Sequence, residues 1–244
     1  MKVNCSIPAE SIKLLIFDLD GTLIDSRNDL ANSVNGMLRH FGRKELPLEV
    51  VATYIGDGAP MLVRRALGDP TDEHFLNEAL NYFLAYYREH KLDSTTVYAG
   101  IAEALTILRA ENGVRRAMAV LSNKPVNPSR AIVEALGLGP FFAQVYGGNS
   151  FPTKKPDPMG ALQLLREFEV RAEEALMIGD SSNDVLTGRN CGMWTCGCTY
   201  GFSPQTLVQA PPDVLVDHPS ELPLIFGAQP PEREDYAEIP GEIT

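Results

Sequence analysis

The sequence predicts an α/β fold: a Rossmann-like core with a parallel sheet, and a small helical module inserted after the first strand. Three observations predict it. A short, mostly apolar run near the N-terminus indicates a strand buried on both faces. The next stretch, from residue 26 to about 91, shows helical spacing alone. From residue 101 onward, helical and strand patterns alternate, which is typical of a parallel sheet covered on both faces.

The first strand is expected at residues 12–17, where Leu14, Leu15, Ile16 and Phe17 follow one another. This run leads directly into the polar, glycine-containing segment 18–22, which is expected to be a loop. The first strand therefore ends where a pair of aspartates begins.

The helical module follows. Apolar residues recur at roughly helical spacing from residue 30 to 41, and two further helices are expected at 61–67 and 73–89. We expect residues 26–92 to form this module, and residues 1–25 and 93–228 to form the core domain. The last segment, 229–244, is rich in proline and acidic residues, so it is expected to be a disordered tail.

The remaining core elements alternate along the chain. Helices are expected at 101–111, 128–136, 158–168 and 184–190, and strands at 116–121, 144–146, 175–178, 193–196 and 214–216. In an open parallel sheet, ligands bind beyond the carboxyl ends of the strands. The loops at that edge are therefore where chemistry is expected.

Composition narrows the possible functions. The 244 residues have a hydrophobic fraction of 44% and a formal net charge of -11, which disfavours binding to nucleic acid or to an anionic membrane. No apolar run approaches the ~20 residues of a membrane span, and the N-terminus lacks the apolar core of a signal peptide. We expect a cytoplasmic protein, a monomer or homodimer. The four cysteines fit neither a disulfide framework nor a zinc pattern.

Polar residues follow the expected strands in series. Asp18 and Asp20 follow the first strand, Ser122 follows the next, Lys155 precedes a helix, and Asp180 and Asp184 follow a later strand. Clustered carboxylates repel one another unless a hard cation joins them, and oxygen ligands favour Mg²⁺. A metal and a lysine together favour an anion such as a transferring phosphoryl group.

Each of these residues has an ordinary structural explanation when it is considered alone. Asp184 suits a helix N-terminus, Ser122 a turn, and Lys155 a solvated surface. The complete series at successive strand ends is much harder to explain in this way. It predicts an aspartate that attacks phosphorus and a second carboxyl group that moves a proton to and from the leaving oxygen.

Four segments resemble the haloacid dehalogenase-like superfamily. They are FDLDGTLIDS at 17–26, SNKP at 122–125, KPDP at 155–158 and GDSSND at 179–184. They occur in the family's order, and the resemblance extends to about residue 226. It implies the same core fold, with the helical module as a cap that closes over the site.

The resemblance also implies a role for each matching residue. Asp18 would be the nucleophile and a Mg²⁺ ligand, and Asp20 the general acid and base, with its carbonyl on the metal. Ser122 would bind phosphoryl oxygens, and Lys155 would neutralise the phosphate. Asp180 and Asp184 would complete the metal site. We also expect the substrate to contact further residues, in the core and in the cap: Gly21, Thr22, Asn123, Gly56 and Arg64.

Finer details resemble the phosphoglycolate phosphatases of this superfamily. These are YIGDGA at 54–59, VYAG at 97–100 and the SNKP segment. Asp57 departs from the expected uncharged residue, and an acid facing a substrate carboxylate would be unfavourable, which argues against 2-phosphoglycolate itself. Arg64 would offset this charge if it faced the site, whereas its ordinary structural explanation is a solvated arginine on a helix.

Other functions within and beyond this resemblance stay open. A β-phosphoglucomutase-like phosphomutase shares nearly all of these motifs, and cap contacts decide between the two. A non-catalytic protein of the same fold is disfavoured because every catalytic aspartate is present. A dehalogenase would not need the acid Asp20, and a phosphonatase would need a cap lysine for a Schiff base. The prediction is therefore an Mg²⁺-dependent phosphatase that acts on a small phosphorylated metabolite.

Overall fold

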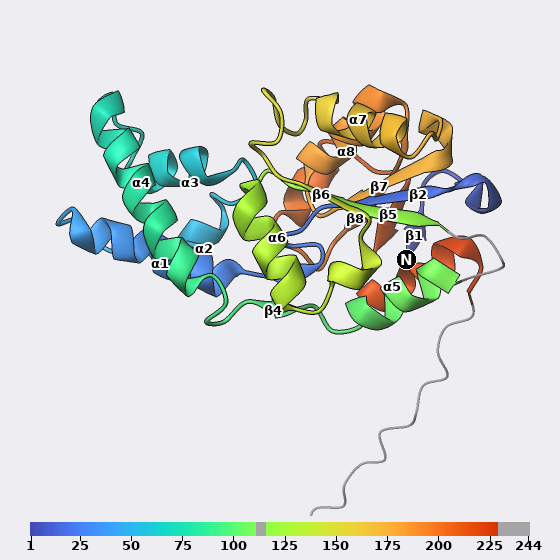
Figure 1. The fold of residues 1–244 in the computed structure, drawn as a ribbon, viewed down its shortest axis with the longest axis horizontal. Coiled ribbons are helices and arrows are strands. Elements are labelled where there is room, and N and C mark those ends of the chain that lie inside the picture. The colour runs from blue at the N-terminus through green and yellow to red at the C-terminus, as the bar shows by residue number, and fades with distance from the viewer. Residues whose placement is uncertain (111–115, 229–244) are drawn as a thin grey trace, which may run out of the picture.

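The computed structural model describes residues 1–110 and 116–228. The expected tail at 229–244, and the end of the helix expected at 101–111, lie outside the described residues. Within them the chain forms a mostly parallel sheet flanked by helices, with a helical module beside it (Figure 1). The predicted fold class is confirmed.

The main sheet joins strands from all parts of the core. In the described part of the chain it has seven strands, in the order β1-β9-β8-β7-β2-β5-β6. Their bounds are β1 Lys2–Val3, β2 Leu14–Phe17, β5 Ala117–Leu121, β6 Gln144–Tyr146, β7 Ala175–Gly179, β8 Trp194–Cys198 and β9 Val214–Val216. Neighbouring strands are parallel, except that β1 runs antiparallel to β9.

Strand β2 lies inside the sheet between β7 and β5, and all four of its side chains are buried. Leu15 and Phe17 belong to one hydrophobic cluster, and Leu14 and Ile16 to another. This alternation follows from the two-residue period of a strand, which sends successive side chains to opposite faces. The continuous apolar run is therefore explained by a strand that is covered on both faces.

Helices cover the two faces of the sheet. Helices α7 (Met159–Glu167) and α8 (Ser182–Cys191) lie on one face. Helices α5 (Ile101–Ala110) and α6 (Val126–Ala135) lie on the other, as Figure 1 shows. The cluster on the α7 side contains Ala161, Leu164 and Leu165.

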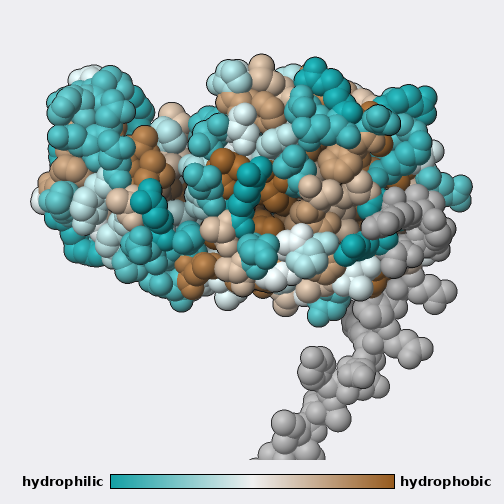
Figure 2. Space-filling model, in the orientation of Figure 1, coloured by the Kyte–Doolittle hydropathy of each residue, from teal (hydrophilic) through white to brown (hydrophobic). Residues whose placement is uncertain are grey.

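The helical module lies at one end of the molecule. It contains α1 (Arg27–His40), α2 (Leu48–Ala52), α3 (Ala59–Ala66) and α4 (Glu73–His90) (Figure 1). Its surface is largely hydrophilic, and hydrophobic residues come to this face of the molecule mainly toward the core (Figure 2). The module is thus an element with a solvated outer surface, inserted after β2.

Two connections tie the module to the core. Strands β3 (Ile24–Asp25) and β4 (Thr96–Val97) pair antiparallel where the chain enters and leaves it. Asp29, a buried acid at the start of α1, accepts hydrogen bonds from the backbone N–H groups of Ser94 and Thr95 and from the Thr95 hydroxyl. The two crossing segments are therefore held side by side.

The sequence did not predict three strands: β1, β3 and β4. Each has only two residues, too few for an alternating pattern to be recognised. Strand β1 is also exposed, and its partner β9 is distant in sequence. The helices and strands that the sequence did predict are present in the described residues, with boundaries that differ by a few residues.

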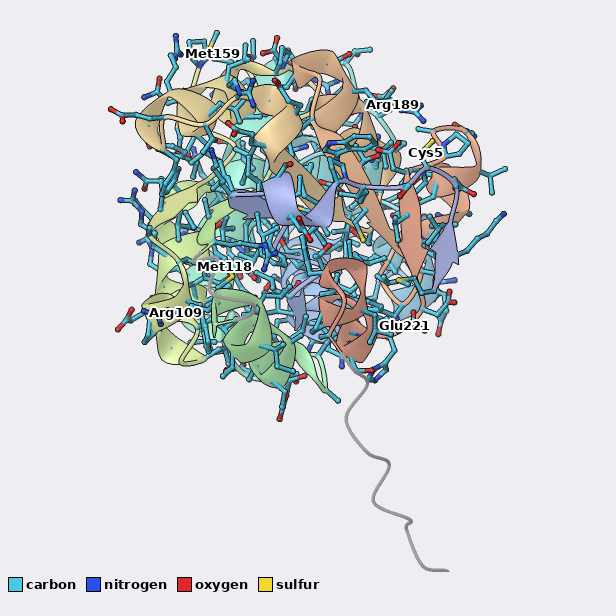
Figure 3. The ribbon with its side chains drawn as sticks, turned by 90° about the vertical axis from the view of Figure 1, so that its right-hand side faces the viewer. Cys5, Arg109, Met118, Met159, Arg189 and Glu221 are labelled. Carbon is cyan, nitrogen blue, oxygen red and sulfur yellow. The ribbon has the colours of Figure 1, made fainter. Side chains whose placement is uncertain are left out.

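The cysteines form no disulfide in the described residues. Cys196 and Cys198 are buried in the hydrophobic core, and Cys191 is partly buried. Cys5 is exposed on the side of the core remote from the helical module (Figure 3). Among residues 1–110 and 116–228, no helix is both long enough and apolar enough to cross a membrane.

Candidate active site

The carboxyl edge of the sheet collects the predicted polar residues. Asp18, Ser122 and Asp180 directly follow β2, β5 and β7, and β2 pairs in parallel with both neighbours. Phe17 is paired with Val120 on one side and with Ile178 on the other. The register therefore places Ser122 and Asp180 level with each other and one residue beyond Asp18 at this edge, where all three are buried.

Three carboxylates meet at this edge. Asp18, Asp180 and Asp184 each offer an oxygen, and these oxygens lie within 4.8 Å of one another. Asp184 is the third residue of α8, where its Oδ2 accepts hydrogen bonds from the Ser181 backbone N–H and hydroxyl at 3.1 and 2.7 Å. Asp184 thus has both the expected helix-capping role and a place in the acidic cluster.

Lys155 lies between two of these acids. Its Nζ is 2.8 Å from Asp18 Oδ1 and 2.6 Å from Asp184 Oδ1, and the lysine side chain is only 3% exposed. The adjacent Lys154 instead donates to the backbone carbonyl of Asp57. The two lysines therefore have different partners, and Lys155 is the one inside the acidic cluster.

The electrostatics of the cluster call for more positive charge than one lysine supplies. Burial raises the pKa of Asp18 to about 6, assisted by the charge of Asp184 and opposed by Lys155. Burial also raises the pKa of Asp180 well above its usual value, as do the charges of Asp184 and Asp18. Asp18 and Asp180 are thus disfavoured in their charged forms unless a cation joins the group.

The residues present fit a magnesium ion. The donor set consists of carboxylate oxygens, which Mg²⁺ prefers. Asp18, Asp180 and Asp184 are all buried, and the lysine in contact with them, Lys155, supplies one positive charge to three acids. A buried group of acids with more negative than positive charge is the arrangement that a divalent cation would complete.

Asp20 stands apart from this cluster. Its carboxylate accepts a hydrogen bond of 2.5 Å from the Ser26 hydroxyl and lies 3.0 and 3.1 Å from the Nζ of Lys124. Its side chain is therefore directed toward other partners than the three clustered acids. This separation suits a proton-transfer group better than a carboxylate ligand of the metal.

Lys124 is a residue that sequence reasoning did not select. It is buried, with a side chain only 4% exposed, and its ammonium lies 4.6 Å from the centre of the Tyr87 ring. A lysine in a loop usually reaches solvent. Its place two residues after Ser122, at a strand end, was the signal that could have identified it.

Of the other core residues that we expected at the site, Ser122 and Asn123 line the cavity and Thr22 does not. Ser122 lines the cavity described below, and its Oγ accepts a 3.3 Å hydrogen bond from the Lys124 backbone N–H. Asn123 also lines the cavity, and its amide donates to the carbonyls of Gly56 and Lys155 at 2.9 and 3.0 Å. Thr22 is fully buried and is not among the residues lining the cavity.

Position 21 requires a glycine, because of its backbone conformation and the closeness of Asp180. It has a positive φ of 84°, and a Cβ atom there would collide with the Asp180 carboxylate. Glycine is the residue that adopts this conformation without steric penalty. It allows the loop after β2 to pass close to Asp180.

The cap residues differ in their relation to the site. Gly56 lines the cavity, whereas Arg64 does not. Arg64 pairs with Asp69 and Glu73 at 3.3 and 2.6 Å on the cap itself. Its cation is directed to these acids, and Arg64 is not part of the site proposed below. Asp57 is likewise absent from the cavity wall.

A cavity of about 50 Å³ lies between the cap and the carboxyl edge. The core contributes Asp18, Asp20, Ser122, Lys124 and Asp180 to its wall. The cap contributes Ile55, Ala59, Leu62, Phe83, Leu84 and Tyr87, which are mainly apolar. A buried nucleophile candidate and a second carboxylate thus face a small space roofed by the cap.

The fold and site define a class of protein, namely an α/β enzyme with an acidic site under a helical cap. A sequence model of the family described as haloacid dehalogenase-like hydrolase matches residues 15–198, and the chain belongs to this family. The predicted family is therefore confirmed.

Relatives within this family are similar over most of the chain. The phosphoglycolate phosphatase of Photobacterium profundum is 38% identical over 220 residues, which cover 87% of this chain and 95% of that protein. The phosphoglycolate phosphatase of Haemophilus influenzae is 35% identical, over 86% of this chain and 96% of that protein.

A solved structure agrees with these relatives. It is the crystal structure of a predicted phosphoglycolate phosphatase from Haemophilus somnus, which is 31% identical and has a TM-score of 0.82. The match covers 88% of this chain and 98% of that one.

Proposed function

We propose that this chain is a phosphatase that hydrolyses small phosphate monoesters, such as 2-phosphoglycolate, through a phospho-aspartate on Asp18. The observation that carries the proposal is the buried group of Asp18, Asp180, Asp184 and Lys155, with Asp20 nearby but outside it. The named activity of the relatives supports the same reaction class. We further propose residues 1–25 and 93–228 as the core domain and 26–92 as the cap domain.

Asp18 would act as the nucleophile. A carboxylate oxygen of Asp18 forms a bond to phosphorus while the bond from phosphorus to the ester oxygen breaks. Asp20 gives its proton to that leaving oxygen, so the alcohol departs neutral. The burial of both acids, at 12% and 11% side-chain exposure, keeps bulk water from competing.

The second half returns the enzyme to its starting state. Asp20, now a carboxylate, takes a proton from a water molecule that attacks phosphorus. The bond between phosphorus and Asp18 breaks, and inorganic phosphate leaves. Lys155 and Ser122 provide the positive charge and the hydroxyl that would hold the phosphoryl oxygens during both steps.

Asp18, Asp180 and the Asp20 carbonyl would hold Mg²⁺, with Asp184 supporting them. When bound, the ion would supply positive charge to neutralise the phosphoryl oxygens and the clustered carboxylates. Asp184 has both of its oxygens occupied, by Lys155 and by Ser181. Its proposed part is therefore to fix the lysine and the start of α8.

The test is phosphate release from a panel of small phosphate monoesters, with Mg²⁺ or with EDTA, by wild type and Asp18→Asn. We expect Mg²⁺-dependent release that the substitution abolishes without a change in melting temperature large enough to indicate unfolding. The panel includes β-glucose 1-phosphate, because its isomerisation without phosphate release would instead identify a mutase. Release that is undiminished in Asp18→Asn would contradict the proposed nucleophile.

A further inference from the structure

A short segment after β8 packs directly on Asp180. We call this segment, residues 200–206, the strap. The backbone N–H groups of Phe202 and Ser203 donate to Asp180 Oδ2 at 2.6 and 3.1 Å. Both hydrogen bonds reach the same oxygen, so the other, Oδ1, is the one that the strap leaves open to a metal ion. A carboxylate fixed in this way presents its open oxygen in one direction, which suits the strict geometry of Mg²⁺ sites.

The strap cannot shift without moving Asp180. A Cβ atom at Gly201 would collide with the Asp180 side chain and with the backbone oxygen of Gly21. Further along the strap, the Thr206 hydroxyl accepts a 2.9 Å hydrogen bond from the backbone N–H of Ser182, the first residue of α8. The strap therefore contacts the stretch from Asp180 to the start of α8 at two points.

Two aromatic residues of the strap also contact the segments that join the cap to the core. The Tyr200 and Tyr98 rings pack edge to face with their centroids 5.1 Å apart, and Tyr98 directly follows β4. The guanidinium of Arg27 lies over the Phe202 ring, with its Cζ 5.3 Å from the ring centre. Arg27 is the first residue of the cap helix α1. The strap therefore reaches both crossing segments as well as Asp180.

Arg27 is itself held where the chain enters the cap. Its Nε and Nη2 atoms lie 3.0 and 2.5 Å from Oδ1 and Oδ2 of Asp25, the last residue of β3. A bidentate pair of this kind fixes the plane of the guanidinium. Arg27 neither lines the cavity nor belongs to the acidic cluster. Its position is therefore that of a residue that supports the site without contacting the substrate or the metal.

We propose that Arg27 and Phe202 are positioning residues that link the entrance of the cap to the metal ligand Asp180. The assignment rests on the function proposed above, in which Asp180 binds Mg²⁺. Arg27 holds the Phe202 ring, and the Phe202 backbone N–H orients Asp180, so the strength of Mg²⁺ binding depends on how the chain enters the cap. Coupling between binding and conformation is reciprocal, so Mg²⁺ in turn steadies the crossing segments.

The sign of the effect separates this role from simple electrostatics. Arg27 carries a positive charge, so its removal would strengthen the binding of a cation if charge alone mattered. Because Arg27 holds the strap, its removal is instead expected to weaken Mg²⁺ binding. The expected loss is ~2- to 5-fold, the factor to which a cation–π contact at a partly exposed site corresponds.

The test is the affinity for Mg²⁺, measured by isothermal titration calorimetry on wild type, Arg27→Met, Phe202→Leu and the double variant. We expect each single variant to weaken binding ~2- to 5-fold. The double variant should bind about as weakly as either single variant, because both substitutions remove the same contact. Arg39→Met is the matched control, since Arg39 lies on the same helix and pairs with Glu45 at an exposed site. It should not weaken binding.

Backbone hydrogen exchange gives a second readout that needs no turnover. Mg²⁺ is expected to slow exchange in β3 and β4 of wild type, and to slow it less in Arg27→Met. The melting temperature in EDTA shows separately whether each variant is folded. If Arg27→Met does not fold, Phe202→Leu decides, because it keeps the backbone N–H that contacts Asp180 and removes only the ring.

Three results would overturn the assignment. The first is Mg²⁺ binding that Arg27→Met and Phe202→Leu leave unchanged or strengthen. The second is an equal loss in Arg39→Met, and the third is a double variant whose loss is the sum of the single losses, which would show that Arg27 and Phe202 act separately. In each case wild type still binds Mg²⁺ and the proposed function stands. If wild type itself binds no Mg²⁺, the proposed metal site fails and this assignment fails with it.

Discussion

Asn183 of the core helix α8 donates a 2.9 Å hydrogen bond from Nδ2 to Oδ1 of Asp57 in the cap. The other carboxylate oxygen of Asp57 lies 2.5 Å from Nη2 of Arg65. In the same loop, the Gly56 carbonyl accepts a 2.9 Å hydrogen bond from Asn123. Asp57 is therefore occupied in holding the cap against the core, and its charge is balanced outside the cavity. From the sequence, we expected the Asp57 carboxylate to repel a substrate that carries a carboxylate. In the structure Asp57 does not line the cavity, so this repulsion is not expected.

Loss of the Asp57 carboxylate should loosen the cap. We expect Asp57→Ala to raise KM several-fold and to speed backbone hydrogen exchange in the loop 55–58, because the cap-to-core hydrogen bond is lost. The coupling with Asn183→Ala, measured by a double-mutant cycle, should be about 0.5 to 3 kcal/mol. Arg64→Ala is the control, since Arg64 pairs within the cap. A coupling near zero would show that the two side chains do not act together.

The same contact should depend on pH in a defined direction. Burial acts to raise the pKa of Asp57, but the hydrogen bonds from Asn183 and Arg65 outweigh it, and the pKa lies below the usual value of 3.8. A group whose pKa is lowered on folding stabilises the fold above its unfolded pKa, and this contribution is lost as pH falls through the folded value. The difference in unfolding free energy between wild type and Asp57→Asn should thus be constant from about pH 6 to 8. It should shrink in acid, as chemical denaturation at each pH would measure.

The core of the fold could be predicted because its signals are local. The run of apolar residues that ends at Phe17 is long enough to indicate a strand covered on both faces, and in the structure it is an interior strand between β7 and β5. The pairs β1 with β9 and β3 with β4 could not be predicted, because they depend on contacts between segments far apart in sequence. A strand of two residues, such as β1, β3 or β4, is also too short to show an alternating pattern of apolar and polar residues.

The part of the site that lies at the ends of the parallel strands could be predicted from the sequence. Asp18, Ser122 and Asp180 come together because parallel strands share an edge, which follows from the topology alone. The partners of Asp57, Arg64 and Lys124 could not be predicted in this way. Asp57 is bound across the boundary between cap and core, Arg64 pairs within the cap, and Lys124 pairs with Asp20 in the core. Each of these partners depends on how side chains pack, which the sequence pattern does not show.

Magnesium should stabilise the folded protein. A ligand that binds only the folded state at a hundred times its Kd adds about 2.7 kcal/mol. For a chain of this size we therefore expect Mg²⁺ to raise Tm by about 5 to 10 °C relative to EDTA. Asp180→Asn should lose most of this shift, and Asp217→Asn, an exposed acid outside the cluster, should keep it. An equal shift in both variants would place the ion elsewhere.

Lys155 and the metal should neutralise the same carboxylates, so that each makes up for loss of the other. Lys155 is buried between Asp18 and Asp184. Removing one partner of a buried ion pair costs about 3 to 5 kcal/mol, because a buried charge is left unpaired. We expect Lys155→Met to lower the free energy of unfolding by this amount in EDTA, and by clearly less in saturating Mg²⁺. Denaturant titrations under both conditions would measure the difference.

The matched control is Lys13→Met, because Lys13 pairs with Glu174 through a side chain that is 58% exposed. Exposed pairs contribute about 0 to 1 kcal/mol, so this substitution should have a small effect that Mg²⁺ does not change. If Lys155→Met is equally destabilising with and without Mg²⁺, the lysine and the ion act on different groups. In that case Lys155 would serve the fold through Asp184 and the start of α8, and the acidic cluster would bind its cation independently of the lysine.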